Sequence, residues 1–461
     1  MIRVLLIPSI AHPIEQNNLS DNSYIDFLAL SIDLMQKKRD DVFWYIITPS
    51  NDDEDKNSLR SLKKTLNFSN THFIDMSIPN KPLNRIHFDV NELKSKLSFT
   101  EYPIDLIFCH QPELIRPLKL FFKKTTNLSP PVIGYLHTFE LPKIDWDGVF
   151  EYNIFGMTEM DSCFLNTLYQ KQMVHEEARK IFSSSVCGKL HEKLEVFPPM
   201  VIPKSIKPNR KGTYENIIVW NHDVNDRKNF IEFERTILSL RKQRDDFKVW
   251  VPFMKKSHKL TREFRWVITG RNSNRREYLE KMRTCCVGVS PKNIYGDWLG
   301  ATIDGNSSGV PYIMFNEQYY KDINNGADFY KTRKGLISKL NKYLNESDYR
   351  NKMAGQTIAN LITKYNMNRK IDVLSKRINL LQKSKRAIRS KLTNEMIQII
   401  KNKKRISHKE LLGPKYLNWK SETKFEGYRK SILNTKGISE VLKISGQRKY
   451  AWKVYYQYKD S

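Results

Sequence analysis

The residues best suited to bind a reactive ligand are concentrated between residues 266 and 318. An apolar run there ends at Gly270, and another is followed by the polar loop Ser290–Asp297. Asp304 lies five residues before the Gly-Val-Pro turn that begins at Gly309. A glycine turn, helix N-termini and one acid suit a nucleotide, because backbone amides bind a base and phosphates while a carboxylate binds ribose hydroxyls. We therefore predict a nucleotide site in this stretch.

The elements that carry these residues alternate between strands and helices. Apolar strand-like runs at 266–270, at 284–290 and after Pro311 are separated by a charged helical stretch and by a helix around Leu299–Asn306. This order implies parallel pairing of the strands, and parallel sheets bind ligands at the carboxyl ends of their strands. The predicted nucleotide site therefore lies at one edge of an α/β sheet.

The same stretch resembles the donor half of GT-B glycosyltransferases, in which an acid in a helix precedes a G-x-P turn and binds a sugar nucleotide. The order VITGRN, VGVSPKNIYGDW, ATIDGNSSGVPYIMFNE and NGADFYKTRKGLISKLNKYL is most similar to phage DNA glucosyltransferases, which place a sugar on hydroxymethylated pyrimidines in DNA. The resemblance covers roughly Ile217–Met353 well and the N-terminal half in patches. It implies an α/β GT-B fold with two Rossmann-like domains facing a cleft. It also implies a UDP-sugar donor such as UDP-glucose, with a divalent cation compatible but not required.

The length and the rhythm of elements predict more than one domain in this chain of 461 residues. Strands and helices alternate up to the proline-rich run Glu195–Ile202, and a basic stretch follows, so a boundary is expected near residue 205. We predict an N-terminal acceptor domain over residues 1–205 and a donor domain over residues 206–370. Residues 371–390 are expected to form a basic helix that either crosses back onto the first domain, as in GT-B enzymes, or faces DNA.

The last 71 residues, Lys391–Ser461, contain 17 Lys+Arg against 6 Asp+Glu, a net charge of +11 by subtraction. Three helical stretches, at 392–401, 407–412 and 421–434, precede an alternating run around Gly446 that is typical of a hairpin. This order resembles the winged-helix class, in which the third helix enters the major groove and the hairpin tip touches the DNA backbone or the minor groove. The DNA-binding residues implied are Arg429, Lys430, Arg448 and Lys449. A basic helical cap that only packs on the transferase is the alternative.

The formal net charge of +28 predicts a polyanionic partner, with nucleic acid expected first and an anionic membrane surface second. Part of the excess also fits the Lys-, Asn- and Ile-rich composition of an AT-rich genome. No apolar run approaches the roughly 20 residues of a spanning helix, so we expect a soluble cytoplasmic protein without a membrane partner. The resemblance places it in a phage-infected host cell. The cysteines are expected to be core thiols of a reducing cytosol: Cys109, Cys163, Cys187, Cys285 and Cys286.

Transfer of a sugar from a nucleotide requires cations and amides around the diphosphate leaving group. In GT-B enzymes, basic residues after the first donor-domain strand meet this group, and Arg227 and Lys228 occupy that place here. Arg271, after the glycine turn, is a third candidate. The alternative for each of the three is an ordinary exposed cation. Asn221 and His222 resemble the turn residues at the end of that first strand and are also predicted to contact the donor.

The nucleoside contacts are predicted from the same resemblance. Asp304 is our candidate for the ribose, with an ordinary helix acid as the alternative. The backbone after Gly270 suits the edge of uracil, because main-chain N–H and C=O groups can pair with it. Ser307 and Ser308 either reach a phosphate or cap the turn at the end of their helix. The remaining donor-binding candidates are Asn272 and Tyr295.

The acceptor hydroxyl must lose its proton to a positioned base. The resemblance implies a carboxylate just after the strand whose counterpart is VIGYLHT, but Phe139 stands at that place. His137 and Glu140, at the carboxyl end of this strand, are our candidates for the base. The alternative for His137 is a buried structural histidine, and the alternative for Glu140 is a charge at the rim of the cleft. Asp21 or Asp26, beyond the first strand, is a more distant candidate. Because of this departure, inversion or retention at the anomeric carbon stays open.

The combined hypothesis is a transferase that moves a sugar from a UDP-sugar onto 5-hydroxymethylcytosine or 5-hydroxymethyluracil in double-stranded DNA. Such an enzyme must widen the major groove or flip the base, at a cost of roughly 2–5 kcal/mol, which many phosphate contacts can offset. One alternative is a GT-B enzyme with another acceptor, such as a modified tRNA base or an envelope glycan. A second is a DNA-binding protein with an inactive transferase scaffold.

Overall fold

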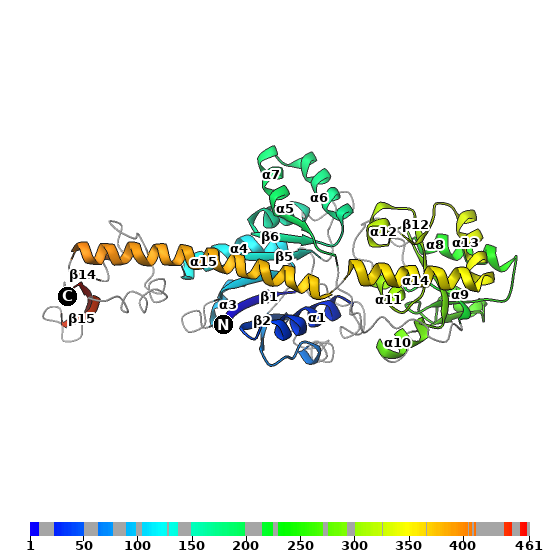
Figure 1. Cartoon of the computed structure of the whole chain (residues 1–461), viewed down its shortest axis with the longest axis horizontal. Coiled ribbons are helices and arrows are strands. Elements are labelled where there is room, and N and C mark those ends of the chain that lie inside the picture. The colour runs from blue at the N-terminus through cyan, green and yellow to red at the C-terminus, as the bar shows by residue number, and fades with distance from the viewer. Residues whose placement is uncertain are drawn as a thin grey trace.

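The computed structural model contains two α/β lobes and a small C-terminal sheet, connected by one long helix (Figure 1). It describes residues 1–8, 23–49, 63–76, 89–97, 104–126, 129–136, 149–198, 214–224, 229–270, 275–292, 300–324, 326–365, 367–403, 405–407, 410–411, 438–444 and 452–458. We call the described residues up to 198 the N-lobe and those of 214–365 the C-lobe. The boundary expected near residue 205 lies outside the described residues.

The N-lobe is built on a parallel sheet of seven strands in the order β3-β2-β1-β4-β5-β6-β7. The strands are β1 (Ile2–Ile7), β2 (Val42–Pro49), β3 (Thr71–Met76), β4 (Leu106–Cys109), β5 (Val132–Leu136), β6 (Ser162–Leu165) and β7 (Leu194–Val196). β4 and β5 are buried at every position and read as continuous apolar runs, because helices cover both faces of the sheet.

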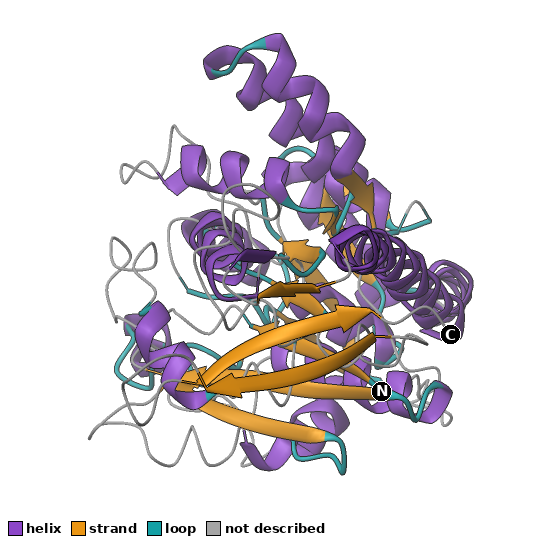
Figure 2. Ribbon diagram, turned by 90° about the vertical axis from the view of Figure 1, so that its left-hand side faces the viewer, coloured by secondary structure: helices purple, strands orange, loops and turns teal. Residues whose placement is uncertain are grey.

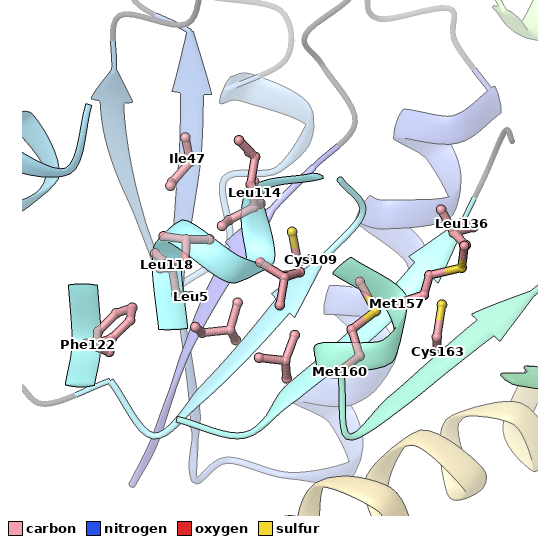
Figure 3. Close-up of a cluster of buried hydrophobic side chains, with 14 of the residues drawn as sticks. Leu5, Ile47, Cys109, Leu114, Leu118, Phe122, Leu136, Met157, Met160 and Cys163 are labelled. Carbon is pink, nitrogen blue, oxygen red and sulfur yellow. The ribbon is translucent and has the colours of Figure 1, made fainter. Parts of the chain in front are cut away.

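Two apolar cores separate this sheet from its helices, which lie on either side of the strands in Figure 2. On one face, α1 (Ser23–Lys38) and the start of α15 pack on Phe108 and Tyr135. The core of the other face is shown in Figure 3 and includes Cys109 and Cys163. The elements of that face are α3 (Val90–Lys96), η3 (Pro112–Leu114), α4 (Ile115–Thr126), α5 (Val149–Glu159), α6 (Leu168–Ile181) and α7 (Ser184–Lys193).

The cysteines largely follow the prediction of core thiols. All five are free; Cys109, Cys163, Cys285 and Cys286 are buried, whereas Cys187 is half-buried on α7. Burial raises the pKa of the Cys286 thiol to about 12, so this thiol stays protonated at neutral pH. The prediction of burial is therefore confirmed for four cysteines.

The C-lobe is built on a parallel sheet of six strands in the order β10-β9-β8-β11-β12-β13. The strands are β8 (Glu215–Val219), β9 (Lys248–Val251), β10 (Val267–Thr269), β11 (Cys285–Ser290), β12 (Tyr312–Phe315) and β13 (Asp328–Tyr330). Its helices are α8 (Phe230–Arg241), α9 (Lys259–Glu263), α10 (Arg275–Met282), α11 (Gly300–Ser307), α12 (Gln318–Ile323), α13 (Arg333–Asn345) and α14 (Ser347–Lys364). The predicted α/β class with parallel sheets is confirmed.

The long helix α15 (Met367–Lys403) returns from the C-lobe to the N-lobe (Figure 1). Ile371, Leu374 and Ile378 enter the N-lobe core, and Arg377 forms an ion pair with Glu195. The first part of the helix therefore packs on the first lobe. The division predicted between residues 390 and 391 falls inside this one helix, because its 37 residues contain neither glycine nor proline to end it.

Beyond α15 lies an antiparallel sheet of three strands, β14 (Arg405–Ser407), β15 (Ile438–Ile444) and β16 (Trp452–Tyr458), in the order β14-β16-β15. The pairing of β15 with β16 confirms the strands predicted on either side of Gly446. The helix predicted at 407–412 is corrected at its start, because Ser407 pairs with Tyr455 as the last residue of β14. Arg429, Lys430, Arg448 and Lys449 lie outside the described residues.

No helix in the described part of the chain is both long enough and apolar enough to cross a bilayer.

Candidate functional site

The carboxyl edges of the two parallel sheets face each other. In the N-lobe, α1 and α6 follow the carboxyl ends of β1 and β6; in the C-lobe, α11 and α12 follow those of β11 and β12. α1 contacts α11 and α6 contacts α12, so the segments that begin at these strand ends meet across the lobes. This is the edge at which parallel sheets bind ligands.

The contact between α6 and α12 includes a carboxylate at a helix N-terminus. The backbone N–H of Tyr169, in the first turn of α6, donates to Oδ2 of Asp322 at 2.8 Å. Gln318 donates to the other oxygen of Asp322 at 3.1 Å, and the rings of Tyr169 and Tyr319 lie 5.2 Å apart. Because a helix N-terminus carries a partial positive charge, the Asp322 carboxylate stabilises this junction between the lobes.

A buried amide attaches α11 to the C-lobe sheet. Asn221, directly beyond β8, is fully buried, and its side-chain N–H groups donate to the hydroxyl of Tyr278 at 3.0 Å and to the carbonyl of Ala301 at 2.7 Å. Its side-chain oxygen accepts from the Tyr312 hydroxyl at 2.8 Å. The contact of Asn221 with the nucleotide sugar stays a prediction. Its hydrogen bonds show that it positions the first turn of α11.

A second bond and a close packing contact hold the same helix. The hydroxyls of Ser290, at the end of β11, and Thr302, in α11, lie 2.7 Å apart and are buried. A Cβ atom at Gly305 would lie 2.0 Å from the ring of Tyr312, so only glycine allows α11 to approach β12 this closely. Strands β8, β11 and β12 therefore all determine where α11 lies.

Asp304 lies in this fixed helix with its side chain half-buried. Its backbone carbonyl accepts from the hydroxyl of Ser307 at 3.0 Å and from that of Ser308 at 2.8 Å. Both serines therefore cap the carboxyl end of α11, which is one of the two roles that the sequence left open for them. Gly309 follows with φ of 83°, in the left-handed region that favours glycine at a helix end.

The glycine turn after β10 is held by a hydrogen bond from the indole of Trp250. Gly270 has φ of 89°, and its carbonyl accepts from Nε1 of Trp250 at 3.2 Å. A Cβ atom at Gly270 would meet no described atom within 4 Å, and the next four residues, 271–274, lie outside the described residues. His222 is buried with its ring 5.6 Å from that of Trp220, which places it under the end of β8 rather than on the surface.

The N-lobe contributes a buried polar group that the sequence reading did not single out. His110 and Glu113, just beyond the central strand β4, are 3% and 7% exposed. The His110 ring lies 5.3 Å from that of Tyr135, whose hydroxyl donates to Asn166 at 2.6 Å. The signal available in the sequence was HQPE directly after the apolar run DLIFC, since polar residues after a buried central strand lie at the ligand-binding edge.

Several predicted site residues cannot be placed. The catalytic candidates His137 and Glu140 lie outside the described residues, as does the alternative Asp21, and of Asp26 only the backbone in α1 is described. The donor-binding candidates outside the described residues are Arg227, Lys228, Arg271, Asn272 and Tyr295. Their roles stay predictions. Within the described residues, no three His, Cys, Asp or Glu side chains gather as metal ligands would.

No family model and no curated protein sequence match this chain. Solved structures match its fold. Anabaena HepE in complex with UDP and glucose has a TM-score of 0.59 at 10% identity, covering 82% of this chain and 99% of HepE. An E. coli trehalose-6-phosphate structure bound with UDP-2-fluoro glucose has a TM-score of 0.56 at 13% identity, covering 82% and 98%. The α,α-trehalose 6-phosphate synthase of Burkholderia multivorans has a TM-score of 0.56 at 14% identity, covering 83% and 99%.

These matches establish the fold of the two lobes. Each includes almost the whole length of the other protein and thus both of its lobes, so the chain has the two-lobed GT-B architecture that the sequence predicted. The match to HepE leaves 18% of this chain outside it.

Proposed function

We propose that this protein is a glycosyltransferase that uses a UDP-sugar donor. The observation that carries the proposal is the structural match of both lobes to proteins solved with UDP and glucose or with UDP-2-fluoro glucose. The match covers nearly the whole length of those proteins. The helix that contains Asp304 supports it independently, because α11 is attached to the strands of the C-lobe sheet at the edge that faces the N-lobe.

Each group of donor contacts then has a chemical role. The carboxylate of Asp304 binds the ribose hydroxyls, and the backbone after Gly270 pairs with the edge of uracil. Arg227, Lys228 and Arg271 neutralise the charge that grows on the diphosphate as the sugar leaves, which lowers the barrier because this charge exists mainly in the transition state.

The proposed acceptor is the hydroxymethyl group of a 5-hydroxymethylpyrimidine in double-stranded DNA, in the cytoplasm of a phage-infected cell. His137 or Glu140 takes the proton of its hydroxyl. The net charge of +28 supports a polyanionic acceptor. A helix that leads into a small antiparallel sheet ending in a hairpin supports the winged-helix assignment, with Arg429, Lys430, Arg448 and Lys449 on DNA.

Transfer of labelled glucose from UDP-glucose tests the acceptor. We expect label in a duplex that contains 5-hydroxymethylcytosine or 5-hydroxymethyluracil and none in an otherwise identical plain duplex. Equal and negligible transfer to the two hydroxymethylated duplexes and the plain duplex would refute DNA as the acceptor. Parallel reactions with tRNA, a lipid carrier and a free sugar phosphate identify another acceptor, and transfer to one of these retains the glycosyltransferase while replacing DNA.

Thermal unfolding with and without UDP tests the donor half separately. A ligand at 100 times its Kd stabilises the folded state by about 2.7 kcal/mol, so UDP should raise the melting temperature measurably. No stabilisation by UDP or UDP-glucose, together with tight DNA binding, would favour an inactive scaffold that only binds DNA.

A further inference from the structure

The helix α15 is anchored at both ends to different parts of the molecule. Near its start, Ile371 and Ile378 are buried in the N-lobe core, and Nε2 of Gln382 donates to the carbonyl of Asp105 at 2.9 Å. Near its end, Met396 and Ile400 are buried where α15 contacts β14 and β16. Between these anchors the helix crosses from the N-lobe to the C-terminal sheet (Figure 1).

One face of the helix continues through the crossing. Buried residues recur at positions 371, 374, 378 and 382, and again at positions 396 and 400. The same spacing of three or four residues connects the two groups through positions 385, 389 and 392, which therefore share that face. Positions 385 and 389 are Lys385 and Arg389, so the face that is apolar at both anchors has cationic positions in between.

The composition of the crossing segment indicates a partner rather than a spacer. Residues 383–391 include five cations, and the chain has no acid between Asp372 and Glu395. Of the five, only Lys391 has an acid three or four residues away, which is Glu395. Like charges at this spacing destabilise a helix, and helices that bridge solvent usually alternate acids with bases. An added polyanion removes this repulsion.

The dimensions of the segment fit a stretch of nucleic acid backbone. From Gln382 to Met396 the helix rises about 21 Å at 1.5 Å per residue. This length corresponds to about six base-pair steps of a duplex at 3.4 Å each. Positions 385, 386 and 389 fall within about 100° of one another around the helix, so one duplex can place phosphates beside these three cations. A duplex bound here would lie beside both the N-lobe and the C-terminal sheet.

We propose that Lys383–Lys391 of α15 is a binding surface for the phosphate backbone of duplex DNA between the N-lobe and the C-terminal sheet. The choice of DNA as the polyanion rests on the proposed function. The contact itself is independent of base modification, because phosphates are the same in plain and hydroxymethylated DNA. This surface increases the affinity for the duplex and fixes its position, in addition to any recognition by the C-terminal domain.

The experiment compares two full-length variants with equal change in charge. In the first, five cations of α15 become glutamine, which preserves helix propensity: K383Q, K385Q, R386Q, R389Q and K391Q. In the control, five exposed cations on outer parts of the two lobes become glutamine: R179Q, K189Q, K242Q, K248Q and K352Q. The dissociation constant for a plain 30-base-pair duplex is measured from 50 to 300 mM salt, with circular dichroism as a check of folding.

The expected result is a change in the salt dependence. Each lost phosphate contact lowers the magnitude of the slope of log K against log salt by about 0.9. Loss of the contacts of Lys385, Arg386 and Arg389 should therefore lower this magnitude by about 2 to 3 in the α15 variant, against less than about 1 in the control. Equal slopes in wild type and α15 variant overturn the proposal, as does a wild type that binds no DNA. If the fivefold variant misfolds, the pair K385Q and R389Q replaces it, with an expected loss of about 2.

Two further measurements separate this proposal from its neighbours. Vesicles with anionic lipid are tested beside DNA, and a loss confined to vesicle binding assigns the surface to a membrane and overturns the DNA assignment. Sugar transfer by the wild type is measured on hydroxymethylated DNA. If the wild type transfers no sugar but the α15 variant has a reduced salt slope, the proposed function is refuted and the α15 surface is supported. If transfer is normal but the salt slope of the α15 variant equals that of the wild type, the proposed function is supported and the α15 surface is refuted.

Discussion

The two lobes share a parallel-sheet architecture but stabilise it with different side chains. Of the ten largest fully buried side chains in the described part of the chain, two, Trp44 and Tyr135, belong to the N-lobe, and the other eight are tryptophans and tyrosines of the C-lobe. The C-lobe tyrosines donate to atoms at strand and helix ends: Tyr312 to Asn221, Tyr320 to the carbonyl of Pro291, and Tyr365 to the carbonyl of Ile323. The N-lobe core shown in Figure 3 is mainly aliphatic and sulfur-containing.

This difference teaches how each lobe positions its ligand-binding edge. In the C-lobe, core residues also make directed hydrogen bonds, so packing and the placement of α11 are coupled. In the described part of the N-lobe, the core acts mainly through non-directional packing. We therefore expect C-lobe core substitutions to change nucleotide binding together with stability, and N-lobe core substitutions to change stability alone.

The largest effect is expected for Asn221→Ala. The substitution removes hydrogen bonds to two buried tyrosine hydroxyls and to the carbonyl of Ala301, at about 1–3 kcal/mol for each buried group that finds no other partner. We expect a loss of about 3–5 kcal/mol in the free energy of unfolding, with weaker UDP binding, measured by urea denaturation and calorimetry. Asn351→Ala, at an exposed position, should change stability by less than about 0.5 kcal/mol. Unchanged UDP affinity in the Asn221 variant would break the comparison.

Leu118→Ala tests the N-lobe side of the comparison. Leu118 is fully buried in the core on α4, and truncating a buried leucine costs about 2–5 kcal/mol through lost burial and a residual cavity. UDP affinity of the folded protein should stay within about twofold of wild type, since the C-lobe is untouched. Leu118→Met, which keeps the volume, should cost less than about 1.5 kcal/mol. A loss of UDP binding in folded Leu118→Ala would contradict the assigned division of labour.

Asp304→Asn tests whether Asp304 contacts the ligand or instead stabilises α11. Hydrogen bonds to a charged group contribute about 1.5–3 kcal/mol, so UDP affinity should fall about 10- to 150-fold. The melting temperature without ligand is measured beside it, because a fall in UDP affinity at an unchanged melting temperature shows a lost ligand contact rather than a displaced α11. Asp348→Asn, in the exposed first turn of α14, is the matched control. Equal UDP affinity in both variants would remove Asp304 from the site.

The pH dependence of stability probes the hydrogen-bonded character of the C-lobe. Burial opposes ionisation of Asp328, but hydrogen bonds from Lys339, Tyr349 and Tyr343 lower its pKa below the ordinary value. A carboxyl with a lowered folded-state pKa stabilises the fold above its unfolded pKa of about 3.9, and this stability disappears as pH falls through the folded pKa.

Asp328→Asn should therefore destabilise the protein by about 1–3 kcal/mol at pH 7, because charge-assisted hydrogen bonds are lost. The difference from wild type should shrink between about pH 5 and pH 3. Urea denaturation at several pH values measures it, and Asp348→Asn again serves as the exposed control. A difference that stays constant down to pH 3 would show that charge is not the source of the stabilisation.

The smallest effect is expected at the junction of the lobes. Asp322→Ala removes the carboxylate that accepts from the backbone N–H of Tyr169, and loss of such a cap costs about 0.5–2 kcal/mol. The amides in the first turn of α6 should exchange with deuterium faster by the corresponding factor, while the C-lobe core exchanges as in wild type. Asp322→Asn retains an acceptor oxygen and should give an intermediate rate. Identical exchange in all three proteins would show that the lobes do not use this contact.

Much of the fold was predictable because its signals are local. Apolar runs such as LIFC and VIGYL indicate buried strands of a parallel sheet, and the Gly-Val-Pro turn indicates where the helix around Leu299–Asn306 ends. The C-terminal segment was predicted less well. The sequence predicts a short helix that begins at Ser407, whereas Ser407 ends β14 in the structure. Pairing with β16, some fifty residues later in the chain, decides the conformation of so short a segment.

The candidate site was predicted by residue type more than by role. Ser307 and Ser308 suit a phosphate contact or a cap by their chemistry, and only the tertiary structure shows that their hydroxyls donate to the carbonyl of Asp304. His110 and Glu113 were overlooked because a polar run after a strand does not reveal which strand is central. The strand order answers that question by placing β4 between β1 and β5.

The sequence by itself determined the alternation of strands and helices, the charge of the chain and the position of Asp304 before its Gly-Val-Pro turn, since each depends on residues close together in the chain. Tertiary structure decided which distant groups meet. Asn221 bonds to Tyr312, 91 residues away, Tyr169 to Asp322 across 153 residues, and Gln382 to Asp105 across 277. Hydrophobic periodicity indicates which face of an element is buried, but the partner of a hydrogen bond depends on how the elements pack in three dimensions.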